Sequence, residues 1–179
     1  MKKSILFAMF LGGLFAANAQ ATGQTELKVK LNPVQSIVVN DDKVVLDYVT
    51  QENYALGVSE TKNNHLTVFS TGKFKVKVKA DANLTDGNGK SIALDDPATA
   101  IKIHATQGTV GANSPLVAFS GSEISLSTTD QVIGGSDTAG VGGINVKYTG
   151  AGSDAYVNLL NNGTATTLTT NVTYSIVAE

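Results

Sequence analysis

The chain of 179 residues contains no cysteine, no tryptophan and no arginine. Without cysteine no disulfide can form, so stability must come from an apolar core and from backbone hydrogen bonds. Without arginine the chain lacks the side chain that makes bidentate contacts to bases and phosphates, which disfavours a nucleic-acid partner. Without tryptophan it lacks the largest aromatic platform for a sugar ring.

Catalytic signatures are scarce as well. The two histidines, His65 and His104, sit beside strand residues in no recognised motif and are expected to face solvent. No Gly-x-Ser-x-Gly elbow marks a serine nucleophile. Asp137-Thr138-Ala139-Gly140 resembles the turn of aspartic proteases, but Ala139 replaces the required glycine and no second copy exists. We therefore predict a protein that is not an enzyme and that uses no cofactor.

The first residues have the pattern of a secretory signal peptide. Two lysines precede an apolar run, Ile5–Phe15, and Ala17-Asn18-Ala19 is a typical cleavage site. The run is shorter than the roughly 20 residues that a membrane span requires. We expect residues 1–19 to be removed and residues 20–179 to be exported, to the periplasm, the outer surface or the medium, with no transmembrane span. The exported chain would carry 11 lysines against 15 acidic residues, a net charge of −4.

Alternation of apolar and polar residues predicts strands. The clearest case is the stretch 73–80, where Phe74, Val76 and Val78 alternate with lysines. Successive side chains on a strand face opposite sides, so this pattern predicts one dry face and one wet face. The lysine face comprises Lys73, Lys75, Lys77 and Lys79. Leu66–Ser70 is a second apolar run, and the turn Ser70-Thr71-Gly72 between the two predicts a β-hairpin.

About ten such segments, and no convincing helix or linker, predict one domain over residues 20–179. Its expected class is all-β, a single Ig-like antiparallel β-sandwich. A second hairpin is expected from Gln35–Asn40 and Lys43–Val49, with Val44, Leu46 and Tyr48 or their neighbours facing the core. Further along, Ala155–Leu160 is predicted as a strand, Thr128–Gly143 as the most loop-like region, and Thr166–Ala178 as the longest strand. In that last segment Leu168, Val172, Tyr174 and Ile176 share one parity.

Two surfaces are candidates for interaction. Thr25–Leu31 alternates, with Leu27, Val29 and Leu31 on one side, and Pro33 ends the predicted strand. Terminal strands are the elements that β-sheet polymers exchange between subunits, because an added strand supplies ladder bonds and side chains together. The lysine face could meet an anionic polymer, although a solubility face is the simpler interpretation.

Polar loops offer two weaker candidates. The stretch 81–88 contains oxygen ligands that suit calcium, namely Asp81, Asn83, Asp86 and Asn88. An EF-hand loop would place a glutamate at its twelfth position, where this chain has Ile92, so turn formation explains the stretch and no metal is predicted. Thr138, in Asp137-Thr138-Ala139, matches the short sequon that receives O-glycans in exported Bacteroidota proteins.

Several stretches together resemble a group of small exported Bacteroidota proteins with a fimbrial or pilin-like appearance. The resemblance is carried by Ala17–Gln20, His65–Val68, Phe74–Ala80, Ile144–Tyr148 and Asn171–Ala178. It implies an Ig-like sandwich and a surface or structural role. We expect a structural or adhesive protein that contacts itself or other surface proteins, with a fibre subunit as one form of this role. The alternative is a module that binds a glycan or a cell-wall polymer.

Overall fold

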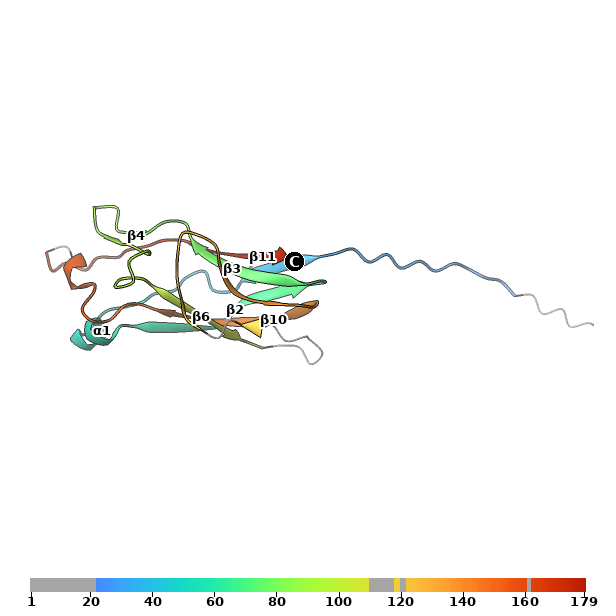
Figure 1. Cartoon of the computed structure of the whole chain (residues 1–179), viewed down its shortest axis with the longest axis horizontal. Helices are drawn as coiled ribbons and strands as arrows, with labels where there is room; N and C mark the ends of the chain where they lie inside the picture. Colours follow the sequence, from blue (N-terminus) through green and yellow to red (C-terminus); the bar gives the residue numbers. More distant parts are fainter. Residues whose placement is uncertain (1–21, 110–117, 120–121, 161) are drawn as a thin grey trace, which may run out of the picture. The chain divides into compact units, whose positions relative to one another are not determined.

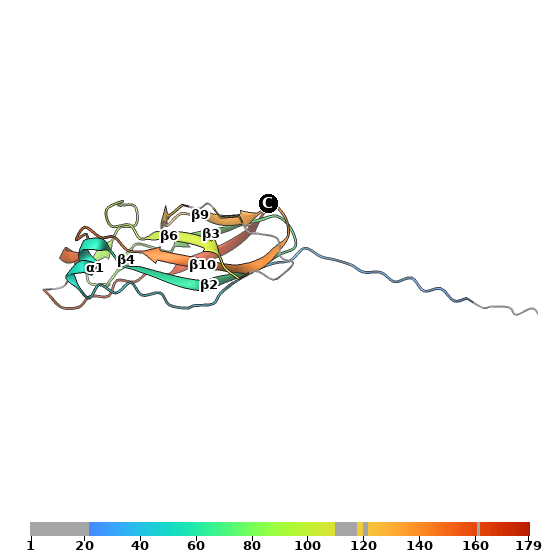
Figure 2. The same ribbon diagram turned by 90° about the horizontal axis from the view of Figure 1, so that it is seen from below.

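The computed structural model describes residues 22–109, 118–119, 122–160 and 162–179. The predicted signal peptide lies outside these residues. The chain divides after Leu31 into two units, and all the named helices and strands lie in the second, Asn32–Glu179. In chain order (Figures 1 and 2) they are β1 (Gln35–Val39), α1 (Gln51–Leu56), β2 (Ser59–Ser70), β3 (Phe74–Ala80), β4 (Leu84–Thr85), β5 (Ser91–Ile92), β6 (Lys102–Gln107), β7 (Ala118–Phe119), β8 (Ile124–Ser125), β9 (Gln131–Ser136), β10 (Gly140–Thr149), the 3-10 helix η1 (Val157–Leu159) and β11 (Val172–Ala178).

The described strands form antiparallel sheets. One sheet has the order β1-β2-β10-β6-β8, a second has β11-β3-β9-β7, and β4 pairs with β5. Among the residues that the structure describes, helix is limited to six residues in α1 and three in η1. This composition agrees with the predicted all-β class.

The strand pattern of β3 is confirmed. Its burial alternates along the whole strand, with Phe74, Val76 and Val78 inside and the intervening lysines partly exposed. These apolar side chains join one core cluster with residues of the other large sheet, such as Leu66 on β2 and Ile144 on β10. The two large sheets therefore bury their apolar faces in a common core.

The predicted hairpin between β2 and β3 is wrong. β2 pairs with β1 and β10, whereas β3 pairs with β11 and β9. The turn instead carries the chain from one sheet to the other, where the Ser70 hydroxyl donates to the carbonyl of Gly72 at 2.8 Å. The crossing is favourable because the dry faces of both strands can then contribute to one core.

Other segment predictions also fail. Lys43–Val49 forms no strand and so no hairpin with β1, and Ala155–Leu160 contains turns and η1 rather than a strand. Thr128–Gly143 is not a loop, because it contains β9 and the start of β10. Its glycines allow close strand packing: a side chain at Gly135 would collide with the backbone carbonyl of Phe74. The segment 166–171 lacks a continuous ladder, so the last strand begins at Val172.

The predicted strand at Thr25–Leu31 is not formed. Residues 22–31 have no regular secondary structure. Leu27, Val29 and Leu31 are 86%, 76% and 87% exposed. A strand is stabilised by a neighbouring strand, and none of the described strands pairs with residues 22–31. Its alternating pattern is therefore present without a partner.

Candidate interaction groove

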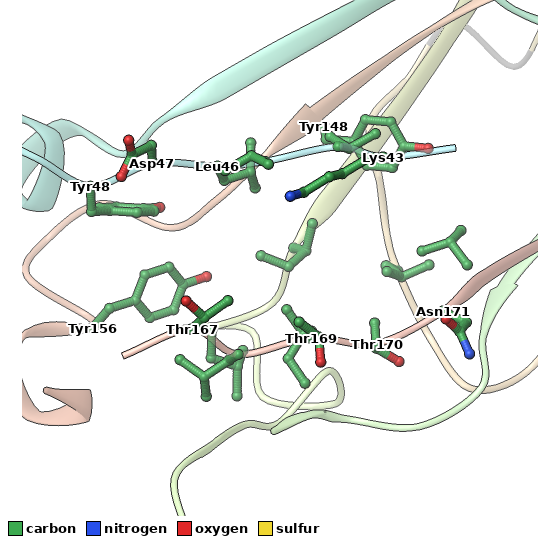
Figure 3. A pocket seen from close by; sticks show the side chains of 18 of the residues that line it. Lys43, Leu46, Asp47, Tyr48, Tyr148, Tyr156, Thr167, Thr169, Thr170 and Asn171 are labelled. Carbon is green, nitrogen blue, oxygen red and sulfur yellow. The ribbon is translucent and has the colours of Figure 1, made fainter. Parts of the chain in front are cut away.

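Two extended segments outside the ladders flank a groove of about 830 Å³. Wall 1 comprises residues 41–48, which follow β1, and wall 2 comprises residues 165–171, which lead into β11. Figure 3 shows the walls running side by side in opposite directions, with Lys43 and Asn171 toward one end and Tyr48 and Tyr156 at the other. Because β1 and β11 are edge strands of different sheets, the groove follows the seam between the sheets.

Wall 1 begins where Asn40 ends the pairing of β1 with β2. The Asn40 amide donates to the carbonyl of His65 at 2.8 Å, which is the last ladder bond. Its side-chain Nδ2 donates to the Asn64 carbonyl at 2.6 Å and to Thr67 Oγ1 at 2.9 Å. Asn64 has a φ of 50°, in the left-handed region that asparagine tolerates, so β2 bends there. The chain beyond Asn40 consequently leaves the sheet.

The side chains of wall 1 keep the alternation predicted from the sequence. Val44, Leu46 and Tyr48 are half-buried against the core, while Val45 between them is 54% exposed. The backbone groups of residues 42–47 make no hydrogen bond to any other described residue. Wall 1 is thus packed on one face by its side chains and unpaired along its backbone edges.

Wall 2 is paired on one edge at Thr169 and at Asn171, whose carbonyl accepts from the Asp81 amide at 3.0 Å. Thr169 exchanges two backbone hydrogen bonds with Thr85, of 3.0 and 3.1 Å. In an extended chain the backbone groups of adjacent residues point to opposite edges. Those of Leu168 and Thr170 therefore point away from Thr85, and they bond to no described residue. The inward side chains of Leu168, Thr170 and Val172 confirm the predicted parity.

The floor of the groove is the hydrophobic core itself. Core side chains line it between the walls, among them Ile92, Ile101, Leu126, Tyr148 and Tyr156. Each of these is at most 7% exposed. An apolar side chain that entered the groove would contact the core directly.

Three tyrosines close one end of the groove. The ring of Tyr48 lies 5.3 Å from that of Tyr54 and 5.1 Å from that of Tyr156, centroid to centroid. The Tyr48 hydroxyl donates to the Ala151 carbonyl at 2.8 Å, and the Tyr156 hydroxyl donates to the Thr99 carbonyl at 2.7 Å. Burial raises the pKa of Tyr48 and of Tyr156. These hydroxyls are therefore neutral and already bonded within the fold.

A polar chain borders the groove toward its other end. His65 Nδ1 lies 3.2 Å from Asp41 Oδ2, and its Nε2 lies 2.9 Å from the Tyr148 hydroxyl. That hydroxyl is in turn hydrogen-bonded to the hydroxyl of Tyr174. Burial raises the pKa of Tyr148 to about 12, and burial together with Tyr148 raises that of Tyr174. Because both imidazole nitrogens are engaged and the phenols stay protonated, the arrangement fastens the two sheets together.

The expectation that His65 faces solvent is wrong, since its side chain is 2% exposed. The bend at Asn64 makes His65 and Leu66 consecutive buried residues, which a regular strand does not allow. The pair Asn63-Asn64 predicts a turn, but the sequence does not indicate that one strand continues through it. His104, on β6, is half-buried.

The candidate calcium ligands lie apart from the groove and take part in hydrogen bonds within the fold. Asp86 Oδ1 accepts from the amides of Asn88 and Lys90, at 2.7 and 3.0 Å. Asn83 Oδ1 accepts from the Leu94 amide, and Asp81 Oδ1 accepts from the Thr173 hydroxyl. Within the described ranges, no three His, Asp or Glu side chains gather as a metal would require.

The lysine face is where the pattern placed it, on the outer side of β3. Lys75 pairs with Glu179, and Lys77 Nζ lies 3.6 Å from Asp130 Oδ2. Lys73 is exposed before the strand begins, and Lys79 is half-buried. Two of the four predicted cations are thus matched by carboxylates of the same chain. The structure does not bring this face together with the groove walls.

Thr138 lies in the exposed turn between β9 and β10. Its amide donates to Ser136 Oγ at 3.2 Å, and its hydroxyl donates to the Ala139 carbonyl at 3.2 Å. The candidate glycan acceptor is therefore on the surface.

Comparison with known proteins provides no family for this chain. No protein-family model matches it, and a search of curated proteins finds no significant match. In the part of the chain described by the structure, no helix has the length and apolar character needed to cross a bilayer.

Proposed function

We propose that the chain is an exported, non-enzymatic structural or adhesive surface protein, an Ig-like β-sandwich that works through protein–protein contacts. The groove is the contact site, and an extended segment of a partner fills it. The observation that carries this proposal is the unpaired backbone of residues 42–47 in wall 1 and of Leu168 and Thr170 in wall 2, in two segments that flank an apolar floor.

Strand addition suits this geometry on two counts. A strand laid between the walls would pair with unpaired amides and carbonyls, as at any open sheet edge. Its inward side chains would at the same time cover Leu126, Ile101 and the other core residues of the floor. Backbone pairing gives affinity, and alternate side chains in an apolar groove give specificity.

The tyrosines give little support to the alternative of glycan binding. An aromatic platform for a sugar needs an exposed ring face. Tyr148, Tyr156 and Tyr174 are buried, and Tyr48 and Tyr54 are half-buried against each other. A partner chain therefore fits the groove better than a saccharide.

The test compares lysines introduced inside the groove with lysines introduced outside it. Residues 20–179 are prepared as a groove-face variant, with Leu46→Lys and Leu168→Lys, or as an outer-face variant, with Val38→Lys and Val177→Lys. Val38 on β1 and Val177 on β11 are exposed and do not line the groove. Light scattering after size exclusion and negative-stain microscopy report assembly, and pull-down on polysaccharides reports glycan binding. Circular dichroism confirms that both variants are folded.

We expect the groove-face variant to lose assembly and the outer-face variant to keep it. Equal behaviour of the two folded variants would refute the groove as the contact site. Retention on a polysaccharide that only the groove-face variant loses would favour the glycan module instead.

A further inference from the structure

We propose that the segment which fills the groove is Thr25–Leu31 of a second copy of this chain, added as a strand with Leu27, Val29 and Leu31 facing the core. The inference rests on the proposed function and names its partner. It joins two features that the structure leaves incomplete, a groove without a strand and an alternating segment without a sheet.

The apolar side chains of the segment match the floor of the groove. Leu27, Val29 and Leu31 are at least 76% exposed, so each has apolar surface to bury. They occupy alternate positions, and in an extended chain they point to one side. The groove offers apolar surface along one side only, because its floor is the core and its opposite side is solvent. One face of the segment would thus become dry, and Glu26, Lys28 and Lys30 would remain in water.

The lengths agree. Thr25–Leu31 and wall 2 (Ala165–Asn171) each contain seven residues. Seven extended residues span about 23 Å at roughly 3.3 Å per residue. A donated strand would therefore run along the whole of wall 2. The backbone groups of Leu168 and Thr170, near the centre of this wall, bond to no described residue.

The charges are complementary. Between residues 25 and 31 the segment has two lysines and one glutamate, a net charge of +1. Wall 1 contains Asp41, Asp42 and Asp47 against Lys43, a net charge of −2, and wall 2 contains no charged residue. Opposite net charge favours encounter and register between segment and groove.

A segment of the same chain is limited by its covalent attachment to the folded unit. It is attached through Val34, whose amide donates to Thr71 Oγ1 at 2.8 Å and whose carbonyl accepts from the Thr71 amide at 3.0 Å. The groove begins only at Val39, about 17 Å farther along β1 at roughly 3.3 Å per residue. A segment folded back from Val34 would have to run along the free edge of β1, where β11 already makes contact. A second copy meets no such obstacle.

The arrangement makes the contact heterologous. Each copy has one segment to donate and one groove to fill, so copy follows copy head to tail. Such an interface produces an open filament unless the rotation between subunits closes a ring.

Disulfide trapping tests this pairing directly, because the wild-type chain has no cysteine to interfere. One protein carries Val29→Cys and the other Leu168→Cys; the two are mixed under mild oxidation, and the linked peptides are identified by mass spectrometry. We expect a mixed disulfide dimer, since same-face neighbours on paired strands lie within bonding reach. In the matched control Lys28→Cys replaces Val29→Cys, and the mixed dimer should be lost because residue 28 faces the other way.

Two further readouts separate the ways in which the proposal could fail. A single chain with both Val29→Cys and Leu168→Cys that forms only an internal disulfide would show that the segment fills its own groove. A triple variant carries Leu27→Ser, Val29→Ser and Leu31→Ser. If this variant still assembles through the groove, and no Val29–Leu168 disulfide forms, the assigned occupant is overturned while the groove remains the contact site. Assembly that is indifferent to the groove variants would instead refute the proposed function.

Discussion

The hydroxyl of Tyr148, on β10, is hydrogen-bonded to the hydroxyl of Tyr174, on β11. These strands belong to different sheets, so the pair joins the sheets along the seam where the groove opens. Tyr148 also bonds to His65 on β2, which bonds to Asp41 at the start of wall 1. The same chain of contacts therefore holds the sheets together and fixes where wall 1 begins.

Removing the two hydroxyls should have unequal effects. Tyr148→Phe leaves Nε2 of buried His65 without its partner, and an unsatisfied buried polar group costs about 1–3 kcal/mol of unfolding free energy. Tyr174→Phe removes one bond but leaves Tyr148 paired with His65, so we expect a loss of about 0.5–1.5 kcal/mol. Urea unfolding measures both. Tyr54→Phe is the control, since that hydroxyl bonds to no described residue; equal losses in all three variants would contradict the assigned network.

Stability should fall in alkaline solution. The pKa of Tyr148 is raised to about 12 by burial, and that of Tyr174 is raised for the same reason, whereas an unfolded tyrosine ionises near pH 10. Above about pH 10 the unfolded chain therefore loses protons that the folded chain retains, which favours unfolding. The free energy of unfolding should be level below about pH 10 and then decline by up to about 1.4 kcal/mol per pH unit for each such tyrosine. Urea titrations across this range test it, and Tyr148→Phe should decline less steeply. A level profile to pH 12 would argue against the burial of these hydroxyls.

The two faces of β3 should differ strongly in sensitivity. Phe74 is fully buried in the core, so Phe74→Ala should cost about 3–5 kcal/mol through lost contacts and a cavity. Lys77 is on the outer face in a partly exposed pair with Asp130, so Lys77→Ala should cost less than about 1 kcal/mol. Chemical denaturation of both variants checks the contrast. Comparable costs would mean that β3 does not present one dry and one wet face.

Alanine substitutions at two glycines of similar φ should distinguish backbone strain from steric crowding. Gly57 and Gly87 both have positive φ, of 85° and 74°, so alanine is strained at either position. A Cβ at Gly87 meets open space, and we expect Gly87→Ala to cost about 1–2 kcal/mol. A Cβ at Gly57 would collide with the Gly150 carbonyl and lie 3.1 Å from the Gly152 amide nitrogen, so Gly57→Ala should cost at least about 1 kcal/mol more. Thermal and urea unfolding measure the difference, and its absence would place the 150–152 segment farther from α1.

Local periodicity predicted the side-chain faces well. The alternation of β3 and the shared parity of Leu168 and Tyr174 appear in the structure. For Lys43–Val49 the sequence left two parities open, and the structure has Val44 and Leu46 facing inward. Each depends only on the geometry of an extended chain, in which neighbouring residues face opposite ways. The apolar lining of the groove could be predicted to that extent from the residues alone.

The partners of the strands could not be predicted in the same way. Whether β2 pairs with β3 or with β10 is decided by contacts between residues far apart in sequence, and the short turn at Thr71 is compatible with either. The groove itself depends on Asn40 and Asn64, which are ordinary turn residues when considered one at a time. Only their contact across the β1–β2 pair releases wall 1 from the sheet. The unpaired edge of wall 2 was missed for another reason. The apolar alternation of wall 2 continues without a break into β11, whereas the backbone pairing of β11 begins only at Val172.

Val34 and Glu179 both make hydrogen bonds to the turn after β2. Val34 bonds to Thr71, and the Glu179 amide donates to the Lys73 carbonyl at 3.2 Å. The entry to the folded unit and its final residue thus share one corner of the molecule, an arrangement that commonly tolerates circular permutation. A short linker from Glu179 to Asn32, with new ends opened in the exposed Gly87–Gly89 turn, should preserve both sheets. Such a permuted chain would lack residues 25–31. The segment could then be added as a separate peptide, and its binding to the groove could be measured by titration. A fluorescent label is best placed in the Gly87–Gly89 turn. A label fused at Glu179 would crowd Val34, through which residues 25–31 are attached.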